Sequence, residues 1–109
     1  MPTIIIPEPL PNKLLDLLIA IRKRPAMYIS YNSICNLKSY IDGWLYAKNY
    51  EVEDIEILDS FHDWIIGKFE IKTAQSWDRI ILFYSTDEST ALNYFFELFD
   101  SFLSDSKKV

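Results

Sequence analysis

The sequence predicts an all-α fold, a single domain of about five helices with room for one minor strand element. Apolar residues recur at i, i+3, i+4 and i+7 through several stretches, and residues that cap helices precede most of these stretches. No repeat or linker divides residues 1–109. Half of the residues are hydrophobic, and three Trp, seven Tyr and seven Phe supply large side chains for a core.

A proline-rich segment precedes the first predicted helix. Residues 1–11 are expected to form an extended arm, because four prolines exclude helix there, and Thr3–Ile6 suits a short edge strand. The apolar spacing then predicts a helix over 12–23. Pro25 ends this helix, since the residue before a proline is pushed out of the helical region.

The clearest helical spacing in the chain predicts a second helix over 34–49. Its apolar stripe includes Trp44, and either Asn32 or Ser33 can cap its first turn. An acidic connector over 51–59 follows, with no lysine or arginine in it.

The third predicted helix runs over 60–69, with Asp59 or Ser60 as its N-cap. Trp64 belongs to its apolar face. We expect this tryptophan and the other two to lie on core-facing stripes, because large aromatic side chains dominate the cores of small domains.

A fourth helix is predicted over 77–85, capped by Ser76. The apolar run 80–84 would also suit a buried strand, because periodicity alone does not separate the two in a short run. We favour the helix, since the spacing of the apolar residues also fits it.

The last predicted helix runs over 87–104, and its apolar residues cover more than one face. We expect a capping box at its start, in which the Ser85 hydroxyl accepts from the amide of Glu88 and the Glu88 carboxylate reaches back. Residues 105–109 are expected to fray.

The chain holds few of the residue types that build active sites. His62 is the only histidine and Cys35 the only cysteine, so the usual zinc ligand sets are missing. We expect Cys35 to be a small buried hydrophobe and His62 to be an exposed or capping residue. We therefore assign no catalytic, cofactor-binding or metal-binding residue, and predict that the protein is not an enzyme.

The composition also limits the partners and the compartment. The net charge is −5, and such a field repels phosphate backbones and attracts basic surfaces. This charge predicts a basic protein partner and no direct contact with nucleic acid. A lone cysteine fits a reducing compartment. The first residues lack the basic region of a signal peptide, and the apolar runs are too short to span a bilayer, so we expect a cytoplasmic protein without membrane contact.

Acidic residues gather in two stretches that contain no lysine or arginine. Six acids lie within 51–63, where Phe61 and Trp64 interleave with them, and five lie within 80–106. Such a run is usually a solvated face, but an aromatic anchor ringed by carboxylates also suits a docking surface for a basic protein. The candidate partner-binding residues are Glu53, Asp54, Glu56, Asp59, Asp63, Trp64, Glu97 and Asp100.

Residues 21–29 read IRKRPAMYI and resemble the RKRPGMYIG segment of the ATPase domain of bacterial type II topoisomerases. Ala26 and Ser30 stand where that segment has glycine, and the two glycines of the chain cannot build the glycine-rich phosphate loops that the ATPase needs. We interpret the segment structurally. Its basic residues suit a helix C-terminus, and residues 27–29 are expected to pack into the core.

Taken in order, four segments resemble immunity proteins of bacterial contact-dependent growth inhibition and related toxin systems. The segments read KRPAMYI, SICNLKSYIDGWLYA, FHDWIIGKF and SWDRIILFYSTDESTALNYFFELFDSFL, and the resemblance spans about residues 14–103. It implies a small protein that binds and neutralises a cognate toxin domain, often a ribonuclease. Immunity surfaces differ between relatives, so no binding residue is carried over.

The alternative function is a helical adaptor or a homodimeric interaction protein with no toxin partner. Its basis is the aromatic excess of the last predicted helix. The oligomeric state stays open, and we favour a monomer within the complex.

Overall fold

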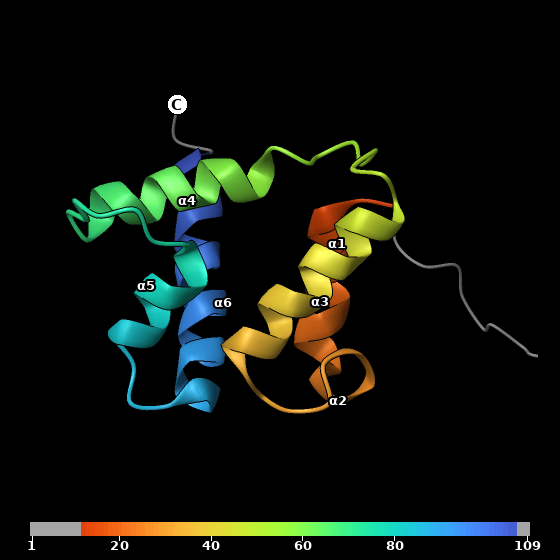
Figure 1. Ribbon diagram of the computed structural model, residues 1–109, viewed down its shortest axis with the longest axis horizontal. Helices are drawn as coiled ribbons and strands as arrows, with labels where there is room; N and C mark the ends of the chain where they lie inside the picture. The colour runs from red at the N-terminus through yellow and green to blue at the C-terminus, as the bar shows by residue number, and fades with distance from the viewer. Residues whose placement is uncertain (1–11, 107–109) are drawn as a thin grey trace, which may run out of the picture.

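The computed structural model describes residues 12–106, which form six helices and no strand (Figure 1). The helices are α1 (Leu14–Lys23), α2 (Pro25–Tyr28), α3 (Ile34–Ala47), α4 (Ile57–Lys68), α5 (Trp77–Phe83) and α6 (Glu88–Ser106). The all-α prediction is confirmed. The predicted arm over 1–11, with its edge strand, lies outside the described residues. Within residues 12–106, no helix is long and apolar enough to cross a membrane.

The longest helix, α6, stands in the middle of the fold. Figure 1 shows it upright, with α5 on one side, α3 and α1 on the other, and α4 crossing its upper, C-terminal end. It packs against α3, α4 and α5. Successive aromatic residues on α6 serve the two sides, because Phe95 contacts Trp77 of α5 whereas Phe96 lies under Arg22 of α1. The apolar excess predicted for the last helix is therefore used in packing on both sides.

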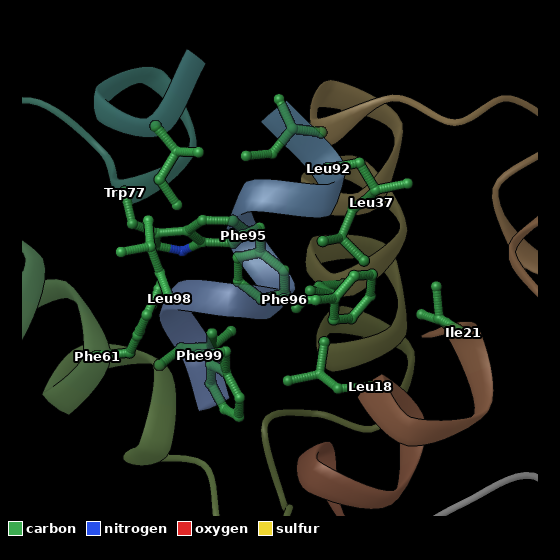
Figure 2. Close-up of a cluster of buried hydrophobic side chains, with 14 of the residues drawn as sticks. Leu18, Ile21, Leu37, Phe61, Trp77, Leu92, Phe95, Phe96, Leu98 and Phe99 are labelled. Carbon is green, nitrogen blue, oxygen red and sulfur yellow. The ribbon is translucent and has the colours of Figure 1, made fainter. Parts of the chain in front are cut away.

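An aromatic cluster around Phe61 joins three of the helices (Figure 2). Phe61 is 0% exposed, and its ring centroid lies 5.2 Å from that of Phe99 and 5.5 Å from those of Phe95 and Phe102. Trp77 of α5 completes the cluster at 6.1 Å, edge-on to Phe61. Edge-to-face and offset pairs add about 0.5–1.5 kcal/mol each to the burial of apolar area. The cluster therefore fixes how α4 and α5 lie against α6.

The three tryptophans differ in burial. Trp44 and Trp77 are buried as predicted, and Trp64 is only half-buried. The indole N–H of Trp44 finds no acceptor within the described part of the chain, while Lys48 lies over its ring at 5.3 Å. Trp44 thus contributes through its apolar area and its ring face.

The start of α4 differs from the prediction. The helix begins at Ile57, so Asp59 and Ser60 lie inside it instead of capping it, and Glu56 holds the N-cap position without a side-chain hydrogen bond. The apolar stripe explains the difference, because Leu58 is buried one turn before Phe61 and extends the stripe backwards. The acidic connector therefore ends in the first turn of α4.

Both ends of α6 also differ from the prediction, and the expected capping box is wrong. The hydroxyl of Ser85 donates to the carbonyl of Ile81 at 2.7 Å, so it serves the end of α5. Asp87 caps α6 instead, with its Oδ1 accepting from the amide of Thr90 at 2.7 Å. At the other end the helix continues through residues 104–106, which were expected to fray in part, and residues 107–109 lie outside the described residues.

The segment around Pro25 holds one confirmed and one wrong expectation. Pro25 follows the end of α1 as predicted, and it also occupies the first position of α2, where its fixed φ suits a helix. Ile29 is buried and Tyr28 packs edge-on against Tyr40. Met27 was expected in the core, but it is 68% exposed.

Phe61→Ala should lower the free energy of unfolding by about 3–5 kcal/mol, the usual cost of truncating a buried phenylalanine. Phe83→Ala is the matched control, because it is the same substitution at a side chain that is 77% exposed, and it should change stability by no more than about 0.5 kcal/mol. Urea denaturation measures both. Equal midpoints for the two variants would contradict the central place of Phe61.

Candidate functional site

The predicted partner-binding residues divide into those with a partner inside the fold and those without one. Asp54 has the strongest internal role. Its Oδ1 accepts from the amide of Leu14 at 2.7 Å and its Oδ2 from the amide of Leu15 at 2.9 Å, the first two residues of α1. Lys13 at the N-cap position of α1 makes no side-chain capping bond, so a carboxylate 40 residues away supplies the cap.

Two further predicted acids form ion pairs with α1 or the residue before it. Glu53 lies 3.6 Å from Lys13, and Asp100 accepts from the Arg22 guanidinium at 2.8 Å. The hydrogen bond from Arg22 to Asp100 raises the pKa of Arg22. Both pairs are exposed, so each contributes little to stability. The acidic stretch of the last helix contains no lysine or arginine. Arg22 of α1 supplies the positive charge that pairs with it.

Trp64 ties α4 to the end of α6. Its Nε1 donates to Asp105 at 3.0 Å, its ring packs on Phe61, and Lys68 lies over the ring at 5.5 Å. Phe61 was considered as part of an aromatic anchor on the surface, but it is fully buried. Of the two aromatic residues, only Trp64 has a part of its ring at the surface.

Three predicted acids form an acidic stripe, defined as Glu56 at the N-cap position of α4 and Asp59 and Asp63 within the helix. All three are exposed, and within residues 12–106 none of their carboxylates makes an ion pair or a hydrogen bond. Their spacing of three and four residues places them on one face of the helix. Glu97 is also exposed, but it lies close enough to Arg22 to help raise the pKa of that guanidinium.

A hollow of about 400 Å³ lies beside the acidic stripe, between α3, α4 and the start of α5. Asp59 belongs to both the stripe and the hollow. The lining residues are Lys38, Asp42, Leu45, Tyr50, Ile55, Leu58, Asp59, His62, Ser76 and Trp77. Sequence reasoning missed this site, because its walls come from four separate segments and no local pattern links them.

Polar side chains around the hollow are held in place. Lys38 pairs with Asp42 at 2.6 Å, one turn apart on α3. His62 was expected to be exposed or capping; it is half-buried, and its Nε2 lies 2.8 Å from the carbonyl of Gln75, to which it must donate. Two carboxylates line the hollow, and of these Asp59 forms no ion pair among the described residues.

A second polar group joins the starts of α3 and α6. The Glu88 carboxylate accepts from the Ser33 hydroxyl at 2.9 Å, from the Cys35 amide at 3.1 Å and from the Cys35 thiol at 2.9 Å. Ser33 also caps α3 as predicted, accepting from the amide of Asn36. Glu88 thus caps a helix other than its own, which no local sequence rule would reveal.

Cys35 is exposed, so the expectation that it is buried is wrong. The hydrogen bond to Glu88 raises the pKa of its thiol to about 11. The same bond, with the other donors, lowers the pKa of Glu88. Because the thiolate is the nucleophilic form, this thiol is poorly suited to attack at neutral pH.

The arrangement offers no cluster for a metal ion. Among residues 12–106, no group of three or more His, Cys, Asp and Glu side chains is placed to hold one. Asp78 is buried on α5, and its Oδ1 has no hydrogen-bond partner in the same range. Nothing in the structure explains that unpaired oxygen.

Comparison with known proteins leaves the chain without a matching relative. No family model, curated protein or solved structure matches it. The functional interpretation therefore depends on the residues and geometry described above.

Cys35 should react slowly with iodoacetamide in spite of its exposure. At pH 8 a thiol with a pKa of about 11 carries about 100-fold less thiolate than one at the ordinary value of 9.0. Glu88→Gln should speed the reaction, because it removes the charge that stabilises the protonated thiol, whereas Asp87→Asn should not. Mass spectrometry of timed samples measures the three rates, and equal rates for wild type and Glu88→Gln would contradict the assignment.

Glu88 should make the fold sensitive to acid. Its pKa is lower in the folded state than the ordinary 4.5, so its stabilising contribution is complete above about pH 4.5 and is lost as the pH falls through the folded value. Glu88→Gln should therefore be less stable than wild type at pH 7. The difference in melting temperature between the two proteins should narrow towards pH 3. Melting temperatures across this range test it, with Glu70→Gln as the control, because that carboxylate is exposed and forms no ion pair or hydrogen bond among the described residues.

Proposed function

We propose that this protein is a cytoplasmic immunity protein that binds and neutralises a basic toxin domain, a nuclease, through the acidic stripe of α4. The observation that carries the proposal is the use of the acids. Asp54, Asp87 and Glu88 cap helices, and Asp100 holds Arg22, whereas the stripe serves no internal contact within residues 12–106.

The energetics of the stripe support a role outside the fold. Glu56 and Asp59 lie at the start of α4, where the macrodipole favours negative charge, but like charges three and four residues apart also repel each other. A nuclease, in contrast, needs a basic surface to hold its phosphate substrate. Carboxylates in a row can occupy the positions that phosphates would take, and complementary charge speeds the encounter of the two proteins. The resemblance to immunity proteins points in the same direction.

Binding without catalysis is part of the same proposal. The Cys35 thiol is held protonated by Glu88, and the Nε2 of His62 is engaged by the carbonyl of Gln75. These are the two residues on which a small enzyme would most readily depend. No cofactor or nucleic acid is proposed, and the complex is expected to contain one copy of this chain.

The adaptor alternative was based on the aromatic excess of the last predicted helix. The aromatic residues of α6 are buried against neighbouring helices instead of being presented to a partner helix. The exposed aromatic residues lie elsewhere, for example at Phe83, the last residue of α5, and at Tyr84, which follows it. The acidic stripe therefore favours the immunity function over the adaptor.

Glu56→Gln, Asp59→Asn and Asp63→Asn combined should slow association with the toxin encoded beside the gene, without loss of the fold. Neutralising rim charges acts mainly on the association rate, and wild-type association should fall steeply with salt while the variant responds less. Asp54 is left unchanged, because Asp54→Asn would weaken the side-chain cap at the start of α1. Stopped-flow or surface plasmon resonance measures the rates.

The matched control removes three exposed acids that are not candidate partner-binding residues, through Asp16→Asn, Glu51→Gln and Glu70→Gln. It has the same net charge as the stripe variant. Equal slowing in both would mean that net charge alone acts, and would contradict the stripe as the interface. A wild-type chain that neither binds the toxin nor rescues growth would reject the immunity function itself.

A further inference from the structure

The hollow beside the acidic stripe is lined by both apolar and charged side chains. Of the apolar ones, Leu58 and Trp77 are buried, and Leu45 and Ile55 are half-buried. Its volume of about 400 Å³ is at the lower end of the range for small-ligand sites. A hollow of this size can hold one long side chain of a partner, whereas a flat partner surface would leave it unfilled.

The charges of the hollow favour a cation. Asp42 and Asp59 bring two negative charges, and Lys38 brings one positive charge that is already paired with Asp42 at 2.6 Å. Asp59 is left without a cation among the described residues. The neighbouring members of the stripe, Glu56 and Asp63, add to the negative field.

Tyr50 adds an aromatic side chain to the wall. It is 56% exposed, and its φ of 59° lies in the left-handed region, which a bulky residue rarely adopts. Its amide donates to the carbonyl of Leu45 at 2.9 Å and so closes the end of α3. Glycine would meet that backbone requirement without strain, so a tyrosine at this position costs some stability.

We propose that this hollow receives one arginine side chain of the partner, with its guanidinium paired to Asp59 and lying against Tyr50. This inference rests on the proposed binding of a basic protein. Arginine fits better than lysine, because its planar guanidinium pairs with a carboxylate through two hydrogen bonds and stacks on an aromatic face. Its aliphatic stem can lie along the apolar walls.

The site can be tested without the toxin, by NMR titration with N-acetyl-L-arginine methylamide. The amides of Tyr50, Asp59 and His62 should shift, and N-acetyl-L-lysine methylamide should bind more weakly. Asp59→Asn should raise the Kd of the arginine probe by about threefold or more, because it removes the ion pair. Asp63→Asn is the matched control, since it makes the same change one turn away on α4 and outside the hollow.

Two further variants should move the affinity for the arginine probe in opposite directions. Lys38→Gln should tighten binding, because it removes the one cation of the hollow. Tyr50→Gly should weaken binding while the melting temperature does not fall, because it relieves the left-handed strain. A probe that shifts no lining amide, equal binding of the lysine probe, or equal effects of Asp59→Asn and Asp63→Asn would overturn the inference.

The toxin then separates this inference from the proposed function. If the stripe variant loses toxin binding but Asp59→Asn alone acts no more strongly than Asp63→Asn, the arginine site is rejected and the immunity function stands. If the arginine probe binds as expected but wild type fails to bind the toxin, the site stands and the immunity function is rejected.

Discussion

The packing of Phe61 against the aromatic residues of α5 and α6 is the constraint from which the surface of this protein follows. Phe61 faces inwards from α4, and the ring centroids of Phe95, Phe99 and Phe102 lie within 5.5 Å of its own. A helix that buries one face must turn the opposite face to solvent. The inward direction of Phe61 therefore sets the outward direction of Asp59 and Asp63, and the core determines where the negative charge is presented.

The acids of this chain serve two different purposes. Asp54, Asp87 and Glu88 each accept from amides at the start of a helix, where the macrodipole favours a negative charge. The carboxylates of the stripe stay outside such contacts within residues 12–106. An acidic composition is thus partly a folding device, and only the remaining acids inform on a partner.

Periodicity was enough to predict the helical class and the approximate place of most helices, because the core of each helix is a local pattern. It failed where one segment completes another. The bond of Asp54 to α1 spans 40 residues, and the bond of Glu88 to the Cys35 amide spans 53. The capping box failed for a related reason, since Ser85 serves the helix before it. The hollow around Asp59 could not be predicted, because its walls meet only in the folded chain.

The hydrogen bond between Cys35 and Glu88 also bears on how the protein responds to oxidation by air. Disulfide formation and exchange begin with attack by a thiolate, and a thiol held protonated contributes little of it. Two molecules that collide in air-saturated buffer therefore seldom become cross-linked through their exposed cysteines. The chain can therefore carry a surface cysteine with little tendency to form disulfide-linked dimers during purification and storage.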